Sequence, residues 1–348
     1  MLNKQNNILS SESTIRTALE KLTLLGESLT LFIIDPTSVL IGVVTDGDIR
    51  RGLIRGCKLE NSVVEIMNKK FRSINEEQLT SQAVDDLKKS SAKIIPILDK
   101  NQRIVRFVNI SELNSVLPVH AIIMAGGKGE RLMPLTIATP KPMLEVNGKP
   151  IIEHNIDLLT KYGIGNLHIS VNYLKDTIKD YFGKGESKNI TIDYLDEEKP
   201  LGTFGSIKLS NSYKYPDLLI MNSDLLTNIN FADFYKTFKD SNADMAIATT
   251  SYMVNIPYAV LETENGLVKS FKEKPTYTYF SNAGIYLIKK ELVNEIPNNE
   301  FYNATDLINK LITTNRVVLT YPILGYWLDI GRHEDYKKAN EDFKHINF

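Results

Sequence analysis

Residues 119–144 have the sequence VHAIIMAGGKGERLMPLTIATPKPML, an apolar run followed by a glycine-rich loop. The run up to Ala125 shows neither polar alternation nor a helical period, so it predicts a buried strand. The glycines after it permit positive φ and close backbone approach, so that successive N–H groups can surround a phosphate. They are Gly126, Gly127 and Gly129. This stretch therefore predicts an anion site at the end of a strand.

Two cations in the same stretch point to a polyphosphate ligand. Arg131 presents a fork of donors that fits phosphate oxygens. Lys141 stands between two prolines, which restrict the backbone on both sides and so aim its side chain. The loop lacks the Gly-Lys-Ser/Thr of a Walker motif and does not match the G-x-G-x-x-G dinucleotide pattern. A tight strand-to-helix turn is the alternative explanation for its glycines.

The overall composition excludes several classes of protein. The chain has 348 residues, of which 43% are hydrophobic, which is ample for two packed domains. Its 41 basic and 42 acidic residues nearly balance, so nothing indicates a nucleic-acid or membrane surface. A single cysteine, Cys57, excludes an internal disulfide and fits a reducing compartment. Because the N-terminal segment is polar and no apolar run approaches the roughly 20 residues of a membrane span, we expect a cytoplasmic protein.

Residues 1–117 contain an internal duplication, because the pattern helix–strand–strand–helix occurs twice at a spacing of roughly sixty residues. The predicted strands lie at 29–35, 39–45, 94–98 and 104–109. The predicted helices begin after the cap Thr14 and near Asp48, and occupy 83–89 and 111–117. Pro118 then stops the last helix, so we expect one module over 1–117 and a second domain over 118–348.

From residue 119 onward, predicted strands and helices alternate, which is typical of a parallel or mixed sheet covered by helices on both faces. The composite A-G-G-x-G-x-R-L-x-P-L-T, followed by P-K-P-M-L, resembles the signature of the sugar-1-phosphate nucleotidyltransferases. The resemblance implies an α/β fold with a Rossmann-like mixed sheet of the GT-A-like type. It also implies that Ala125 and the loop glycines bind the nucleotide and that Arg131 and Lys141 are catalytic.

Two aspartates match the positions at which this family binds Mg²⁺. Asp224 follows the apolar run 218–221, at the carboxyl end of a predicted strand, where open α/β sheets place ligand groups. Asp329 lies in a segment that resembles the family signature G-x-W-x-D-x-G-x-x-x-D-Y. Mg²⁺ prefers one or two carboxylates together with phosphate oxygens and water, so this pair suffices. A turn or helix-cap role is the alternative for each aspartate.

Two further segments resemble the part of the family site that binds the sugar phosphate. In F-K-E-K-P, the resemblance assigns Lys274 to the phosphate, as a catalytic residue, and Glu273 to the sugar hydroxyls. In S-N-A-G-I-Y, it assigns Asn282 and Gly284 to the sugar. A solvated charge run is the alternative for 272–274. The implied reaction is in-line attack of the sugar 1-phosphate on the nucleotide α-phosphorus, in which the protein positions and neutralises two anions.

The base is predicted to lie against the glycine loop and the turn at Gly202. Just before that turn stand acidic residues, and one carboxylate can accept both N1–H and N2–H of guanine, whereas uracil and thymine offer one such donor. This favours GTP, with Glu198 or Glu197 as the residue that recognises the base. A helix cap or a solvated loop is the alternative for these acids.

The segment LIGVVTDGDI, residues 40–49, resembles the final strand and helix start of a cystathionine-β-synthase (CBS) motif. The resemblance implies an adenine nucleotide bound by Thr45 and Asp48, and a homo-oligomer held by paired modules. A module for dimerisation and packing alone is the alternative. A CBS pair joined to a nucleotidyltransferase resembles, over nearly the whole chain, the glucosamine-1-phosphate guanylyltransferases of bacterial legionaminic acid synthesis.

The identity of the sugar 1-phosphate acceptor has alternatives, and so does the prediction that the protein is an enzyme. The choice of glucosamine 1-phosphate comes from the resemblance alone, and mannose, heptose and glucose 1-phosphates remain open, as do UTP and CTP. A non-catalytic sensor of adenine nucleotides is a rival from another class. Against it, the expected polar residues of the site are all present, whereas a relic would be free to lose some of them.

Overall fold

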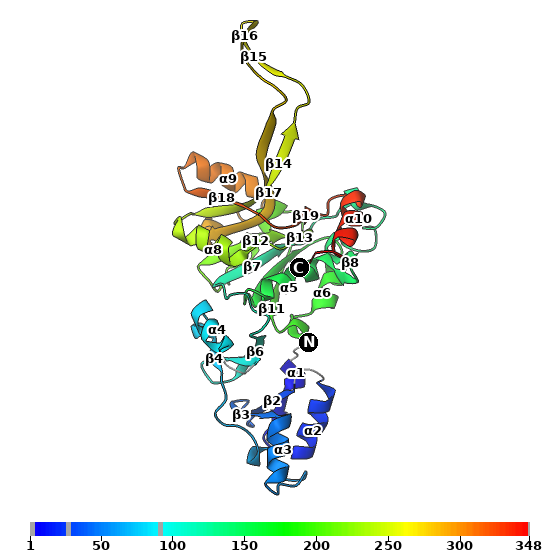
Figure 1. Ribbon diagram of the computed structural model, residues 1–348, viewed down its shortest axis with the longest axis vertical. Helices are drawn as coiled ribbons and strands as arrows, with labels where there is room; N and C mark the ends of the chain where they lie inside the picture. The colour runs from blue at the N-terminus through cyan, green and yellow to red at the C-terminus, as the bar shows by residue number, and fades with distance from the viewer. Residues whose placement is uncertain (1–3, 26–28, 90–92, 347–348) are drawn as a thin grey trace. The chain divides into compact units, whose positions relative to one another are not determined.

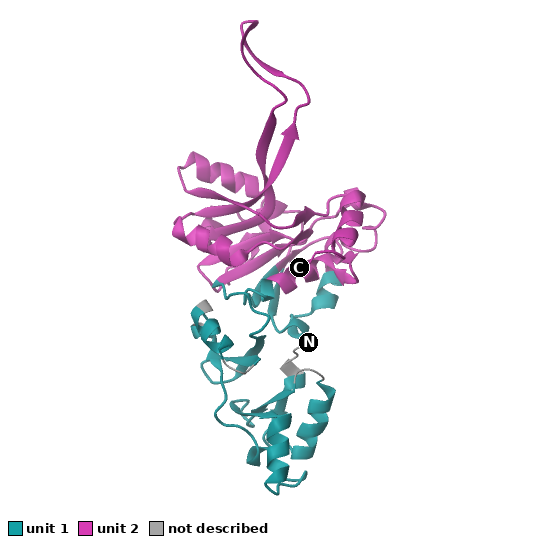
Figure 2. Cartoon of the chain, viewed as in Figure 1, with its two compact units in different colours: residues 1–118, 159–168, 176–194 teal, residues 119–158, 169–175, 195–348 magenta. Residues whose placement is uncertain are grey.

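The computed structural model describes residues 4–25, 29–89 and 93–346. The chain divides into two compact units (Figure 2). Unit 1 comprises residues 1–118, 159–168 and 176–194, and unit 2 comprises residues 119–158, 169–175 and 195–348. From the sequence we expected a single boundary after residue 117, whereas the division falls after 118 and assigns two later segments to unit 1. In the part of the chain that the structure describes, no helix combines the length and hydropathy needed to cross a bilayer.

Unit 1 contains two three-stranded sheets with the same order and the same strand directions. In each sheet the first two strands are parallel and the last two antiparallel. The first sheet is formed by β1 (Ile8–Ser10), β2 (Thr30–Ile34) and β3 (Leu40–Thr45). The second is formed by β4 (Ile74–Asn75), β5 (Ile94–Leu98) and β6 (Ile104–Asn109). The repeated arrangement agrees with the predicted duplication.

Helices of this region begin at capped positions. Thr14 caps the helix α2 by accepting a hydrogen bond from Thr17 N at 3.2 Å. The apolar face of α2 has helical spacing, with Ile15, Ala18 and Leu22 buried. The helices before residue 118 are α1 (Lys4–Asn7), α2 (Ile15–Leu24), α3 (Asp46–Ile54) and α4 (Ser81–Lys88).

The prediction of a helix at 111–117 is wrong, because the structure of this segment is irregular. Asn109 forms an Asx turn instead, in which its Oδ1 accepts from Ser111 N at 3.2 Å and from Ser111 Oγ at 2.7 Å. Farther on, Asn114 N donates to Lys161 O at 2.6 Å and Leu117 N donates to Tyr162 O at 3.0 Å. These N–H groups are therefore satisfied outside any helix.

The two copies of the repeat share a small apolar cluster. The rings of Phe32 in β2 and Phe107 in β6 stack with centroids 4.6 Å apart. Leu40, Leu98 and Ile104 complete the cluster, and each is almost fully buried. Leu40 N also donates to Gln102 O at 3.1 Å, which joins the two sheets through the backbone. Each copy thus covers apolar surface of the other, as expected of a repeat whose single unit cannot bury its own face.

The largest sheet has seven strands in the order β11-β10-β7-β12-β17-β14-β18. It is mixed, as the sequence predicts, because β7 pairs parallel with β12 whereas β12 and β14 pair antiparallel with β17. Its strands are β7 (Val119–Met124), β10 (Asn166–Val171), β11 (Thr191–Asp196), β12 (Asp217–Asn222), β14 (Met245–Asn255), β17 (Thr276–Lys289) and β18 (Val318–Pro322).

Later helices pack on the buried strands of this sheet. In one core cluster, Leu307 and Leu311 of α9 lie with Ile220 and Ile288 of the central strands. The helices are α5 (Ile151–Thr160), α6 (Lys175–Phe182), α7 (Gly202–Gly205), α8 (Phe231–Asp240), α9 (Ala304–Thr313) and α10 (His333–Asp342). Two-stranded ladders are formed by β8 (Glu145–Val146) with β9 (Lys149–Pro150) and by β13 (Leu225–Thr227) with β19 (Trp327–Asp329).

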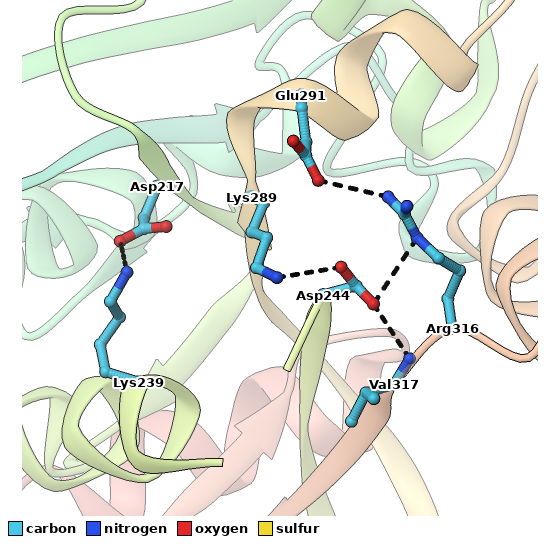
Figure 3. Close-up of polar contacts among 7 residues, drawn as sticks. All are labelled: Asp217, Lys239, Asp244, Lys289, Glu291, Arg316 and Val317. Carbon is cyan, nitrogen blue, oxygen red and sulfur yellow. Dashed lines mark hydrogen bonds and ion pairs between the residues drawn. The ribbon is translucent and has the colours of Figure 1, made fainter. Parts of the chain in front are cut away.

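Hydrogen bonds and ion pairs stabilise the end of the sheet at which β12 begins (Figure 3). Asp244 receives hydrogen bonds from Lys289 Nζ at 3.1 Å and from Val317 N at 3.0 Å, and Arg316 lies 3.6 Å from the same carboxylate. Asp217 pairs with Lys239 of α8 at 2.8 Å. Because β12 runs from Asp217 to Asn222, these contacts lie at the opposite end from Asp224. They hold the strands in register without occupying the end that carries the site.

An extended ribbon leaves the sheet at the other end. The strands β14 and β17 continue to pair as far as Asn255 and Thr276, well beyond the body of unit 2 (Figure 1). Between them stands a hairpin of β15 (Val260–Glu264) and β16 (Leu267–Lys272). We call residues 251–282 the arm.

Candidate active site

The loop after β7 is shaped by its glycines. Gly129 has a φ of 63°, in the left-handed region, and a Cβ there would stand 2.9 Å from Lys141 Cβ. Gly129 O accepts a hydrogen bond from Thr136 Oγ1 at 2.9 Å, which holds the loop against the following turn. In contrast, a Cβ at Gly127 would meet nothing within 4 Å, so this part of the loop faces open space. The predicted phosphate loop thus has a fixed base and an exposed surface.

The two predicted metal aspartates are brought together by a short ladder. Strand β13 pairs antiparallel with β19, and Leu225 stands opposite Asp329. Asp224 directly precedes Leu225, and its carbonyl accepts from Ile330 N at 3.0 Å. Residues about a hundred positions apart are therefore neighbours at the carboxyl end of β12, where a parallel strand neighbour, β7, also ends.

Lys141 stands between these carboxylates. Its Nζ donates to Asp224 Oδ2 and lies 3.9 Å from Asp329 Oδ1, and its side chain is only 11% exposed. Burial raises the pKa of Asp329, and the charge of Asp224 raises this pKa further, while Lys141 and Arg131 oppose the rise. Arg131 lies close by, because a Cβ on Gly331 would be 3.6 Å from its Nη2. The structure thus brings two of the three predicted catalytic cations, Arg131 and Lys141, to both predicted metal ligands.

The carboxylates fit a divalent cation. Asp224 Oδ1 and Asp329 Oδ1 are both buried, and neither accepts a hydrogen bond from a described residue. Buried unpaired carboxylate oxygens are costly, and a bound cation would satisfy them. Where side chains are described, no group of three or more His, Cys, Asp or Glu could hold a metal. Mg²⁺ held here would therefore need phosphate oxygens and water as its remaining ligands, which is its usual preference.

The acidic residues before the Gly202 turn differ in their surroundings. Glu198, the first candidate for reading the base, is exposed. Glu197 is buried, receives hydrogen bonds from Ser170 Oγ and from Leu201 N, and would lie 2.7 Å from a Cβ on Gly126. Of the two acids, Glu197 therefore lies against the phosphate loop.

Two residues that hold Glu197 were not singled out from the sequence. Ser170 donates to its carboxylate, and Asn172 Nδ2 donates to its backbone oxygen at 2.8 Å. The sequence did carry a signal for them, because both stand at the carboxyl end of the apolar strand β10, and such strand ends carry ligand residues. Gly202, with a φ of 74°, packs closely on Tyr302 O and Asn303 Oδ1.

Asn282 and Gly284 lie at the base of the arm, beside the end of β12. Asn282 Oδ1 accepts from Gly284 N at 2.9 Å, and Gly284 has a φ of 71°. A Cβ on Gly284 would stand 2.6 Å from Asn222 Nδ2. Trp327 Nε1 donates to Ala283 O at 2.9 Å, so the same ladder that carries Asp329 also fixes this strand.

A family model described as nucleotidyl transferase matches residues 120–345, which include the loop, both aspartates and Lys141. The chain belongs to the nucleotidyl transferase family. The mannose-1-phosphate guanyltransferase of Debaryomyces hansenii is 31% identical over 228 residues, which are 62% of this chain and 62% of that protein. The matched region therefore spans less than two thirds of this curated relative's length.

Solved structures resemble the same region of this nucleotidyl transferase. The crystal structure of HddC from Yersinia pseudotuberculosis is 28% identical, with a TM-score of 0.52, and the match covers 65% of this chain and 99% of that one. The structure of HddC complexed with GMP-PN is 27% identical, with a TM-score of 0.51, and covers the same shares. Unit 2 thus has the mixed α/β fold of this family.

In this nucleotidyl transferase, Glu273 and Lys274 do not join the other predicted site residues. Both are exposed, between β16 and β17 in the arm, and Lys274 has a φ of 40°. Asn282 and Thr276 lie at the two ends of the arm segment of β17, about 20 Å apart at roughly 3.3 Å per residue. Ile256 N donates to Pro275 O at 3.1 Å, so the ladder continues outward toward Lys274.

Thr45 and Asp48 lie in unit 1 and form a capping box at the start of α3. Thr45 N and Thr45 Oγ1 both donate to Asp48 Oδ2, at 2.9 and 2.6 Å. Asp48 Oδ1 accepts from Arg51 at 2.6 Å. The polar groups predicted to bind an adenine nucleotide are thus already paired with one another and with α3, as the helix start itself requires.

Proposed function

We propose that this nucleotidyl transferase transfers the guanylyl group of GTP to a sugar 1-phosphate and releases pyrophosphate. The observation that carries the proposal is the pair of buried carboxylate oxygens of Asp224 and Asp329 that accept no hydrogen bond from a described residue, beside Lys141. This cluster lies at the end of β12, next to the strand that leads into the glycine loop. A cation pocket beside a phosphate loop is what a reaction between two anions requires.

The chain's own residues would position and neutralise the reactants. Asp224 and Asp329 would hold Mg²⁺, which supplies positive charge at the α-phosphate. The open face at Gly127 offers backbone N–H groups to the nucleotide phosphates. Arg131 and Lys141 would balance the negative charge that shifts toward pyrophosphate as the bond to the α-phosphorus breaks.

Guanine recognition is proposed for Glu197. Its carboxylate is held by Ser170 and Leu201 N close to Gly126, at the start of the loop. A fixed carboxylate can accept two hydrogen bonds from the N1–H and N2–H edge of guanine. The names of the relatives, a guanyltransferase and a protein crystallised with GMP-PN, favour the same base.

The acceptor is proposed to be a hexose 1-phosphate. The relative from Debaryomyces hansenii is named for mannose 1-phosphate. The resemblance over nearly the whole chain favours glucosamine 1-phosphate, and hence a place in nonulosonic (legionaminic) acid synthesis. Both acceptors fit a site whose ligands contact phosphate, so a direct comparison of the two sugars has to decide between them.

Unit 1 is proposed to be a tandem CBS module that binds an adenine nucleotide near Thr45 and Asp48. The repeated sheets support the module, whereas the paired side chains of the capping box require rearrangement before they could contact a ligand. Calorimetric titration of AMP, ADP and ATP into the whole protein tests this binding. Absence of heat with all three would leave packing as the role of the module.

Pyrophosphate release in the presence of Mg²⁺ tests the main proposal. The wild-type protein is assayed with each of GTP, UTP, CTP, dTTP and ATP, against mannose, glucosamine, glucose and heptose 1-phosphates. We expect release with GTP and one hexose 1-phosphate, and loss of release when EDTA is added. The variant Asp224→Asn serves as the control for contaminating activity.

Each result has a clear consequence. Release with another nucleotide would keep the reaction class and contradict guanine recognition by Glu197. Preference for mannose 1-phosphate over glucosamine 1-phosphate would contradict the legionaminic assignment. No release with any pair of substrates would contradict catalysis and favour the non-catalytic adenine-nucleotide sensor.

A further inference from the structure

Between Tyr252 and Phe280, the arm makes no described hydrogen bond or ion pair with the body of its own chain. From Ser251 to Asn282 no residue is buried. The hydrogen bonds and ion pairs described for residues 252–280 join arm residues to one another, such as Lys272 with Glu262 at 3.2 Å and Thr276 Oγ1 with Asn255 Oδ1 at 2.8 Å. A two-stranded ribbon standing alone is at best marginally stable in water. The arm therefore needs a surface to cover it.

Large apolar side chains on the arm are exposed to an unusual degree. Their exposed fractions lie between 56% and 75%, and they are Tyr252, Met253, Tyr258, Leu261, Leu267, Val268, Phe271, Tyr279 and Phe280. At about 150–250 Å² for each aromatic side chain, the five rings alone offer roughly 650 Å² of exposed area. Two copies would together supply about 1,300 Å², which reaches the range of about 1,200–2,000 Å² buried by specific interfaces.

The charges and edges of the arm suit a second copy of the same chain. The arm carries three glutamates and three lysines, so its net charge is zero and two arms do not repel each other. A lipid surface would instead favour a basic arm. Over 250–255 and 276–281 the two strands pair only with each other, so the outer edge of the ribbon remains open to another strand.

The direction in which the arm leaves the sheet determines which residues of two copies would meet if their arms paired. Strand β17 is antiparallel to β12 and leaves the sheet beyond Met221, on the side where Asp224 and Asn282 lie. In a two-fold arrangement in which the β14–β17 segments of two arms pair antiparallel, the outer end of one segment lies beside the base of the other. Glu273 and Lys274 precede Thr276 at that outer end, and the base carries Asn282.

We propose that the arm docks on the arm of a second copy and delivers its Glu273 and Lys274 to the sugar-phosphate site of that copy. The proposal rests on the proposed function for the role of Lys274. It accounts for the two findings that a single chain leaves unexplained, the uncovered apolar arm and the distance of about 20 Å or more between Lys274 and Asn282. The sugar-phosphate site is complete only in the dimer.

Crosslinking tests the docking without reference to activity. In a Cys57→Ser background, a chain with Lys274→Cys is mixed with a differently tagged chain with Asn282→Cys and treated with a short bis-maleimide. We expect a covalent dimer that contains both tags. The matched control replaces Asn282→Cys by Ile312→Cys, at an exposed apolar position of α9 outside the arm, and should give none. Equal crosslinking of the control, or no mixed dimer, would overturn the proposal.

Sedimentation tests whether the apolar side chains of the arm hold the dimer. Tyr279→Ser combined with Phe280→Ser should raise the dissociation constant at least tenfold, because buried aromatic residues dominate interface energies. Ile312→Ser, which removes one exposed apolar side chain from the same unit, should leave it unchanged. A wild-type protein that sediments as a monomer at all concentrations would overturn the proposal, as would a dimer indifferent to the arm substitutions.

Complementation tests delivery between copies. Lys141→Ala and Lys274→Ala are each expected to be nearly inactive. Mixed after dissociation, they should recover about one quarter of wild-type activity, because random pairing makes half of the dimers mixed and each of those holds one complete site. Full activity of Lys274→Ala alone, or no recovery on mixing, would contradict the proposal. An inactive wild type that still gives the specific crosslink would instead contradict the proposed function and leave the docked arms in place.

Discussion

At the scale of the residue, Lys141 carries the clearest link between structure and chemistry. Its ammonium group donates to Asp224 and lies 3.9 Å from Asp329, in a position that is almost closed to solvent. Two carboxylates this close repel each other, which is part of why the pKa of Asp329 is raised. Lys141 therefore offsets their charge in the free protein.

We predict that Lys141→Ala lowers kcat by about a hundredfold or more at saturating Mg²⁺ and GTP, because one cation aimed at developing charge typically contributes that much. The matched control is Lys149→Ala, since Lys149 also pairs with a carboxylate of the same unit, Asp157, at 2.6 Å. We expect the control to keep kcat within about twofold, because a partly exposed ion pair contributes little. Circular dichroism on both variants checks the fold, and equal kcat values would contradict the role of Lys141.

Single residues of the site could be predicted to different degrees. Arg131, Lys141, Asp224 and Asp329 are brought together as the motifs indicated. The position of Lys274 could not be foreseen, because a motif names a residue type and says nothing about the direction in which its strand leaves the body. For the base, the sequence left Glu197 and Glu198 open, since only burial beneath Gly126 separates them.

At the scale of the element, the bounds of several buried strands were predictable, whereas the length of the arm was not. Strands β5, β6 and β10 begin and end where the sequence placed them, because their side chains alternate or are buried throughout. Strand β14 continues to Asn255, although its buried residues end at Thr249. The arm buries neither face, so no hydrophobic period marks its length. The three-residue ladder of β13 and β19 could not be predicted from a local pattern either, because it joins segments about a hundred residues apart.

The loop after β7 allows a prediction with its own control. A methyl group at Gly126 would come within 2.7 Å of Glu197 Oε1, whereas one at Gly127 would meet nothing within 4 Å. We predict that Gly126→Ala displaces Glu197 and costs about 1–3 kcal/mol of stability, as overpacking typically does. Gly127→Ala should leave the melting temperature unchanged and raise KM for GTP, because its methyl group enters the proposed phosphate surface. Thermal melts and GTP kinetics separate the two effects, and a reversed order of melting temperatures would contradict this account.

At the scale of the whole molecule, the chain combines a repeated unit with a nucleotidyl transferase fold, and each has its own core. Unit 2 buries large side chains such as Phe204 and Phe234 around the mixed sheet. In unit 1 the cluster around Ile15 belongs to the first copy of the repeat, and the cluster around Ile95 to the second. The Phe32–Phe107 pair belongs to both copies. The duplication was readable from the sequence, but this pairing was not, because two apolar residues in different copies carry no mark of their contact.

The shared cluster predicts how the two copies of the repeat respond to a single truncation. Phe107→Ala removes one of two stacked rings, and we expect it to cost about 3–5 kcal/mol, the usual range for a buried aromatic residue. Because Phe107 packs on Phe32 of the other copy, amide hydrogen exchange should accelerate in both sheets, β1–β3 and β4–β6. Ile15→Ala, within the core of the first copy alone, should accelerate exchange mainly in β1–β3. Exchange measured by peptide distinguishes the variants without assuming a single unfolding transition. If Phe107→Ala affected only β4–β6, the two copies would be independent units and the stacked rings would not couple them.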